Sequence, residues 1–139
     1  MADYIKTLLI VAHAPSTNTQ KMSKAILEGA QNEVIQYVKV KLASPFDCDS
    51  EMVLSSDAII LFTTENFAYM SGALKDFFDR IYYPCLDDHK RNEAKPFAVI
   101  VRAGLDGTGA DTAIKKITIG LKWRQVQEST ICKGKEAFR

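Results

Sequence analysis

Short apolar runs alternate with amphipathic segments along the chain, which is the pattern of repeated strand–helix units. Thr7–Ala12, Ala58–Phe62 and Pro96–Arg102 are apolar runs of strand length, typical of strands buried on both faces of a parallel sheet. Val34–Leu42 alternates apolar and polar residues, which predicts a strand near a sheet edge. Gln125–Cys132 is the fifth predicted strand.

Three segments between these strands have apolar residues at helical spacing, and they predict helices over Asn18–Gln31, Ser71–Tyr83 and Asp111–Leu121. The clearest is the second, with Ser71 as its cap and Pro84 as its end. Its apolar stripe is predicted to face the core and consists of Leu74, Phe77, Phe78, Ile81 and Tyr82. Between the strands, Ser50–Leu54 is expected to form a helical turn and Asp87–Lys95 a charged surface loop.

This alternation, with short connections, predicts a single α/β domain over residues 1–139. Helices should cover both faces of a five-stranded parallel sheet, giving three layers, and strand order 2-1-3-4-5 fits five such strands. The loops that follow the first, third and fourth strands then meet at the carboxyl edge of the sheet, where α/β proteins bind ligands.

Bulk composition narrows the function classes. The net charge of +1 over 139 residues offers no strong field for nucleic acid or an anionic membrane. No apolar run approaches the ~20 residues that span a bilayer. Three cysteines without a CxxC pair indicate reduced thiols in a cytoplasmic protein.

The first loop places polar side chains at the start of a helix. Ser16, Thr17, Asn18 and Thr19 can hold a phosphate through hydroxyls and backbone N–H groups, and the helix dipole favours that charge. The same residues also suit ordinary helix capping, and spacing alone leaves both interpretations open. His13, at the loop's start, is a candidate proton donor or a residue that orders the loop.

The second and third loops supply further candidates. Phe67 and Tyr69 could stack on a flat ring or simply pack under the loop and lie exposed. Arg102 could face a ligand or pair with Asp106 or Asp111. The candidate cofactor-binding residues of these loops are Thr64, Glu65, Asn66, Phe67, Tyr69, Met70, Ser71, Gly72, Arg102, Gly104 and Gly107.

Several other site classes have no motif here. The GxxxxGK[ST] and GxGxxG phosphate-binding patterns are both missing, which disfavours a nucleoside-triphosphate or dinucleotide loop. The two histidines, His13 and His89, are far apart in sequence, so no metal-ligand set is visible. No catalytic residue is assigned.

Two motifs resemble one superfamily. VAHAPSTNT resembles the phosphate loop of flavodoxin-like proteins, and TENFAYMSGALKDFFDR resembles a segment of their NAD(P)H-dependent FMN reductases and quinone oxidoreductases. The resemblance implies a flavodoxin-like three-layer fold that binds FMN. Ser16, Asn18 and Thr19 would hold the phosphate, Thr64–Gly72 would wrap the isoalloxazine with Phe67 or Tyr69 against it, and Arg102–Gly109 would border the ring.

The chain departs from the family pattern at two places. Thr17 stands where the family has glycine, which would strain or reshape the phosphate loop. The sequence also ends where the family continues through a full fifth helix, so we expect one face of the sheet to be partly bare. A homodimer or larger assembly would bury that face, and the partner could complete the flavin pocket.

Three functions agree with this resemblance. The first is an oxidoreductase in which FMN takes a hydride from NAD(P)H and reduces a quinone, a flavin or a similar small molecule. The second is a flavodoxin-type electron carrier or flavin-binding module without turnover of its own. The third is a flavodoxin-like scaffold that has lost the cofactor. Flavodoxin carriers tend to be acidic, so the near-neutral charge favours the enzyme.

Overall fold

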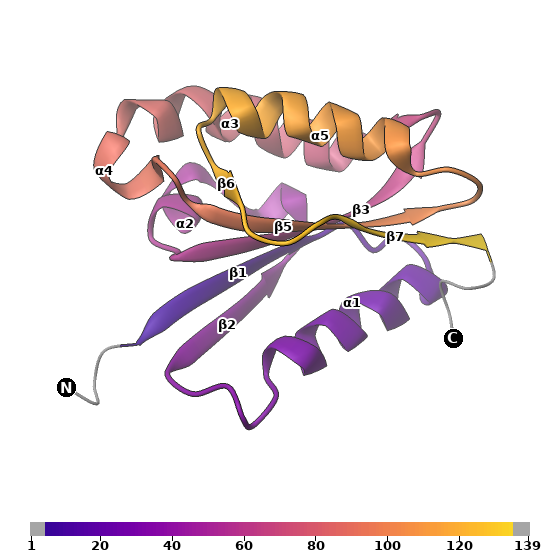
Figure 1. Cartoon of the computed structure of the whole chain (residues 1–139), viewed down its shortest axis with the longest axis horizontal. Coiled ribbons are helices and arrows are strands. Elements are labelled where there is room, and N and C mark those ends of the chain that lie inside the picture. Colours follow the sequence, from indigo (N-terminus) through magenta and orange to yellow (C-terminus); the bar gives the residue numbers. More distant parts are fainter. Residues whose placement is uncertain (1–4, 135–139) are drawn as a thin grey trace.

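A twisted seven-stranded sheet forms the centre of the structure, a computed structural model that describes residues 5–134 (Figure 1). In chain order the elements are β1 (Lys6–Ala12), α1 (Thr17–Ala30), β2 (Val38–Ala43), the 3-10 helix η1 (Pro45–Asp47), α2 (Ser50–Leu54), β3 (Ala58–Asn66), β4 (Tyr69–Met70), α3 (Gly72–Asp87), α4 (His89–Asn92), β5 (Pro96–Ala103), α5 (Thr108–Gly120), β6 (Arg124–Gln125) and β7 (Thr130–Lys133). None of these helices is both long and apolar enough to cross a lipid bilayer.

The main path through the sheet is β2-β1-β3-β5-β6, with all of these neighbours parallel. This confirms the predicted order 2-1-3-4-5. Two details differ from the prediction. The fifth strand is split into β6 and β7, which both pair with β5, and the short β4 folds back antiparallel on β3.

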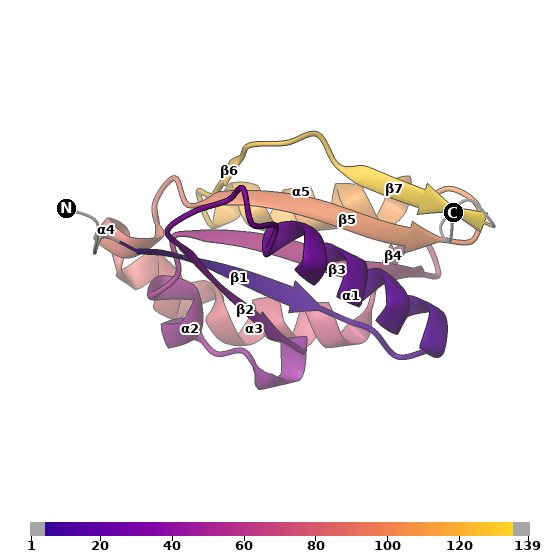
Figure 2. The ribbon, with the colours of Figure 1, turned by 90° about the horizontal axis from the view of Figure 1, so that it is seen from below.

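The helices are distributed unequally over the two faces. On one face α2, α3 and α5 cover the sheet, and Leu74, Phe77, Phe78 and Ile81 of α3 lie in the main core, as predicted. On the other face α1 is the one helix that packs on the sheet within residues 5–134 (Figures 1 and 2). A small cluster there joins Met22 of α1 to strand residues Ile10, Ala12 and Phe62.

The predicted strand Val34–Leu42 begins four residues late, at Val38. Asn32 directs the preceding residues into a turn, because its side-chain oxygen accepts from the Val34 N–H and its carbonyl from the Ile35 N–H. Tyr37 then has a φ of 62°, in the left-handed region that a strand does not use.

Two predictions around Pro84 were wrong. Helix α3 runs past this proline to Asp87, because Cys85 is fully buried and Leu86 packs on the core, so burial stabilises the last turn.

The segment Asp87–Lys95 is not simply a surface loop either, since it contains α4 and its residues Asn92 and Lys95 are buried. Asn92 donates to the Leu121 carbonyl and accepts from the Trp123 indole, which ties α4 to the end of α5. On sequence grounds Lys133–Arg139 could begin a final helix, and all of this segment beyond Gly134 lies outside the described residues.

Candidate functional site

The loops after β1, β3 and β5 meet at the carboxyl edge of the sheet and enclose a hollow of about 260 Å³. Its lining residues come from all three loops and are Ser16, Asn18, Thr19, Thr64, Glu65, Arg102 and Gly104. All seven were candidates on sequence grounds. The parallel order of β1, β3 and β5 brings them together, because it places the carboxyl ends of the three strands side by side.

The first loop builds a capped helix start. Ser16 is the N-cap of α1, its hydroxyl accepts from the Thr19 N–H at 3.2 Å, and the Thr19 hydroxyl accepts from the Ser16 N–H at 2.9 Å. The N–H groups of Thr17 and Asn18 belong to the same first turn and have no acceptor within the helix. Capping and anion binding are therefore compatible, because they use different donors.

Thr17 is the first residue of α1, so its backbone has an ordinary helical conformation, which does not require glycine. Among residues 5–134, the non-glycine residues with positive φ are Tyr37, Phe67, Ala68, Ala94 and Lys122. Thr17 is not one of them, so threonine in place of the family's glycine introduces no left-handed strain at this position.

The second loop is a tight hairpin between β3 and β4. Asn66 pairs with Tyr69, and the two turn residues, Phe67 and Ala68, have φ values of 54° and 60°. Such turns usually use Asn and Gly, because other residues pay about 1–2 kcal/mol for a left-handed backbone. The Phe67 side chain is fully exposed at the tip. Backbone strain of this kind concentrates at functional sites. Here the strained turn holds the Phe67 ring in solvent, where it is accessible to a ligand.

Glu65 joins this hairpin to the third loop. Its carboxylate accepts from the Gly107 N–H at 3.0 Å and from the Ala110 N–H at 3.2 Å. Gly107 is the N-cap of α5 and has a φ of 84° with no side chain to cap the helix, so Glu65 supplies that cap from another loop. A carboxylate is also favoured by the helix dipole there. Glu65 was predicted as a cofactor contact, but sequence patterns do not reveal this pairing across 42 residues.

Gly109, the last residue of the Arg102–Gly109 segment that the resemblance placed beside the ring, makes a close contact between the same two loops. A Cβ atom on Gly109 would lie 2.2 Å from the Ala68 carbonyl oxygen. The backbone of α5 therefore packs directly on the hairpin turn, and only glycine allows it. In the sequence, the hint of this close contact is Gly109 itself, near the start of α5, because glycine allows two backbones to approach closely.

Arg102 supplies the positive charge of the hollow. It is half-buried at the end of β5, and its guanidinium donates to the Ala103 carbonyl. A guanidinium stays charged at every working pH, so it can bind an anion or tune a bound group but cannot act as a general acid. Of its two suggested acidic partners, Asp111 pairs with Lys115 at 2.9 Å.

The remaining candidates lie around the hollow rather than in its lining. His13 lines a neighbouring hollow with Ser44 and Asp47, and burial lowers the pKa of its imidazole. Tyr69 lines another hollow, on the α5 side of the hairpin. Met70 and Ser71 are buried, with the Ser71 hydroxyl capping α3 and bonded to Thr63. Gly72, Thr17, Asn66 and Phe67 are exposed.

Two of the three cysteine thiols, those of Cys48 and Cys85, are buried in the core. Cys48 and Cys85 are free and buried, and burial raises the pKa of each to about 11, so both stay protonated at neutral pH. Across residues 5–134, no three His, Cys, Asp or Glu side chains gather closely enough to hold a metal ion. The lining of the hollow itself offers hydroxyls, the Glu65 carboxylate and the Arg102 guanidinium.

Solved structures share this fold at low sequence identity. A flavodoxin from the domain Archaea matches with a TM-score of 0.72 and 18% identity, over 94% of this chain and 88% of that one. An oxidoreductase from Corynebacterium diphtheriae matches with a TM-score of 0.70 and 16% identity, over 96% and 84%. An NADPH-quinone reductase from P. pentosaceus matches with a TM-score of 0.61 and 20% identity, over 94% and 86%.

No curated protein sequence matches the chain. The sequence model of a protein family does, over residues 5–136, which is nearly the whole length and includes all three loops of the hollow. This match confirms the resemblance seen in the two motifs. The chain belongs to the family of NADPH-dependent FMN reductases.

Proposed function

We propose that this protein binds FMN at the carboxyl edge of its sheet and uses NAD(P)H to reduce a quinone, a flavin or a similar small acceptor. The observation that carries the proposal is the convergence of three loops on one hollow, with helix donors, hydroxyls and one fixed cation in its lining. Family membership supports the same assignment. FMN would supply the redox chemistry, and the protein would supply position and electrostatics.

The donor set suits a terminal phosphate. The first-turn N–H groups of α1 and the Ser16 hydroxyl would donate to it, and the helix dipole would favour its charge. Arg102 lines the same hollow as Ser16 and Asn18, so its charge would add to this attraction. No second phosphate-binding loop of the dinucleotide type follows a strand, and this favours FMN over FAD.

The two other loops would hold the ring. The hairpin residues from Thr64 to Gly72 would contact it mainly through backbone groups, with Phe67 free to stack on it. The loop Arg102–Gly109 would border the opposite side. Glu65 would act as a positioning residue, because it fixes these two loops relative to each other.

An electron carrier without turnover is the second candidate, since flavodoxins share the fold. The discriminating measurement is steady-state oxidation of NADPH or NADH by the FMN-loaded protein with a quinone acceptor. Turnover supports the reductase. Flavin binding without turnover would favour the carrier, and no flavin binding at all would favour a scaffold that has lost the cofactor.

Fluorescence titration of the flavin-free protein with FMN and with FAD tests the binding site itself. We expect FMN to bind clearly more tightly, because the hollow offers one phosphate position. Tighter binding of FAD would overturn the proposed site. The absorption spectrum of freshly purified protein shows whether it carries a flavin after expression, and chromatography of the flavin released by heat identifies it as FMN or FAD.

Asn18→Asp tests the phosphate position directly. The new carboxylate would sit in the first turn of α1, compete with the phosphate for the same donors and repel its charge. We expect FMN affinity to fall about tenfold at low ionic strength, which corresponds to ~1.4 kcal/mol. Asn32→Asp, just beyond the other end of α1, is the matched control and should leave affinity unchanged. Equal affinities of both variants would place the phosphate elsewhere.

A further inference from the structure

The hollow on the α5 side of the hairpin is a groove of about 430 Å³ between α3 and α5, the two long helices on one face of the sheet (Figures 1 and 2). Two lysines line it, Lys75 of α3 and Lys116 of α5, so we call it the lysine groove. Ala113 and Ile117 of α5 supply an apolar part of its lining, and β4 contributes the Tyr69 ring, which is 39% exposed. The groove therefore combines a flat apolar surface with positive charge.

The positive charge of the lysine groove is only partly neutralised. Within residues 5–134 the Lys116 ammonium has neither an ion pair nor a hydrogen bond, and its side chain is exposed. Lys75 donates to Asp79 at 2.7 Å, and this hydrogen bond raises the pKa of Lys75, so both lysines are charged at neutral pH. Asp111 of α5 is already paired with Lys115 at 2.9 Å. An anion entering the groove therefore meets one unpaired ammonium and one shared ammonium.

The start of α5, at the other end of the groove, does not suit a phosphate. The first N–H groups of this helix already donate to the Glu65 carboxylate, and the Thr108 hydroxyl donates to Asp106. A phosphate there would face two carboxylates. Lys116 lies eight residues beyond Thr108, which is about 12 Å along the helix at ~1.5 Å per residue. The anion position of the groove is therefore at its lysine end, where side-chain ammonium groups replace backbone donors.

We propose that the lysine groove binds the adenosine and 2′-phosphate of NADPH, and that Lys116 and Lys75 make the protein prefer NADPH to NADH. The inference rests on the proposed function, since it concerns the hydride donor of that reaction. The two donors differ only in the 2′-phosphate, a monoester with close to two negative charges at neutral pH. Lysines bind phosphate as point charges, and the Tyr69 ring offers a face on which adenine can stack.

The hairpin places this groove within reach of the flavin site. Ala68 of the hairpin turn lines the groove, while Glu65 of the same hairpin lines the hollow proposed for FMN. Gly109 packs against Ala68 and closes the gap between hairpin and α5. A dinucleotide with its nicotinamide on the flavin ring would cross this hairpin, and its adenosine end would then lie along α5 toward Lys116.

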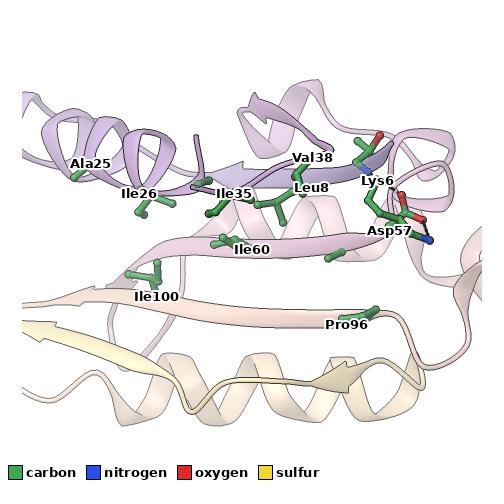
Figure 3. Close-up of a pocket in the computed structure, with 14 residues that line it drawn as sticks. Lys6, Leu8, Ala25, Ile26, Ile35, Val38, Asp57, Ile60, Pro96 and Ile100 are labelled. Atoms are coloured by element: carbon green, nitrogen blue, oxygen red, sulfur yellow. Dashed lines mark hydrogen bonds and ion pairs between the residues drawn. The ribbon is translucent and has the colours of Figure 1, made fainter. Parts of the chain in front are cut away.

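A larger groove of about 780 Å³ on the α1 face does not suit the same ligand (Figure 3). Its charged side chains are those of Lys6 and Asp57, which pair with each other at 3.9 Å. It also lies toward the amino ends of the strands, beside Pro96, whereas the flavin hollow lies at their carboxyl ends. A dinucleotide bound there would have its nicotinamide far from the flavin.

Calorimetric titration of the full chain with 2′,5′-ADP and with 5′-AMP tests the lysine groove without any turnover. We expect 2′,5′-ADP to bind about tenfold more tightly at low ionic strength, because only this nucleotide carries the 2′-phosphate. Lys116→Gln should remove most of the preference, and Lys116→Arg should retain it because arginine keeps the charge. Lys90→Gln is the matched control, since it removes the same charge from an exposed lysine of α4, at the opposite end of the molecule from β4 (Figure 2).

Steady-state kinetics of the FMN-loaded protein shows whether the groove serves the hydride donor. Lys116→Gln should raise KM for NADPH about tenfold with little change in kcat, and should leave both constants for NADH unchanged. Lys75→Gln should act in the same direction but less strongly, because Asp79 already shares its charge. Equal losses with NADPH and NADH would overturn the proposal, since a site for the pyrophosphate would affect both donors.

Failure of this inference and failure of the proposed function give different results. Turnover of NADPH that Lys116→Gln does not change would overturn the lysine groove and leave the reductase intact. If neither donor is oxidised, the reductase assignment fails, and the titration alone decides. Preferential binding of 2′,5′-ADP that is lost in Lys116→Gln would still support the groove, whereas equal binding of 2′,5′-ADP and 5′-AMP would overturn it.

Discussion

Phe78→Ala should lower the free energy of unfolding by about 3–5 kcal/mol, the usual cost of truncating a buried phenylalanine. Phe78 is 1% exposed in the middle of α3, and its ring centroid lies 5.4 Å from that of Phe77 and 6.2 Å from that of Trp123. Its removal leaves a cavity where α3, the sheet and the end of α5 meet. Domains are typically stable by only ~5–15 kcal/mol, so this single change would remove much of the total.

Urea denaturation followed by circular dichroism measures this loss as a lower midpoint with an unchanged slope. Tyr83→Ala is the matched control, because Tyr83 is an aromatic residue of the same helix with 71% of its side chain exposed. We expect its effect to stay near 0.5 kcal/mol, as for most surface substitutions. Equal midpoints for the two variants would mean that the predicted apolar stripe of α3 does not form the core.

The core was predictable because its signals are local. Runs such as Ala58–Phe62 contain only apolar residues, which suits a strand covered on both faces, and the α3 stripe repeats at helical spacing. The order of the strands followed from their alternation with helices. The packing of the predicted helix Asn18–Gln31 on the second face was also expected, and within residues 5–134 α1 packs there against Ile10, Ala12 and Phe62.

What the sequence did not reveal depends on contacts between distant residues. The Asp87–Lys95 segment is rich in charge, yet Asn92 is buried because Leu121 and Trp123 satisfy its amide. At the site, the three loops were expected to meet. The contacts that hold them, Glu65 on the start of α5 and Gly109 on the hairpin, join segments about forty residues apart and leave no periodic signal.

Gly109→Ala should strongly disturb the proposed flavin site, although it adds only one methyl group. The new Cβ would lie 2.2 Å from the Ala68 carbonyl oxygen and 2.8 Å from its carbon. Both atoms belong to the backbone of a strained two-residue turn, so they cannot rotate away as a side chain would. The hairpin must move from α5, and overpacking of this kind costs about 1–3 kcal/mol of stability.

The same movement would pull Glu65 from the Gly107 and Ala110 N–H groups and widen the space proposed for the flavin ring. We therefore expect FMN to bind about tenfold more weakly or worse, a loss of at least ~1.4 kcal/mol, in a fluorescence titration under conditions where the variant is still folded. Gly29→Ala is the control. Gly29 lies in the last turn of α1, at the opposite end of that helix from the hollow, and a Cβ there meets no atom within 4 Å. Alanine at that position should leave FMN affinity unchanged and stability equal or slightly higher. If Gly109→Ala bound FMN as tightly as Gly29→Ala, the contact between α5 and the hairpin would have no part in forming the proposed flavin site.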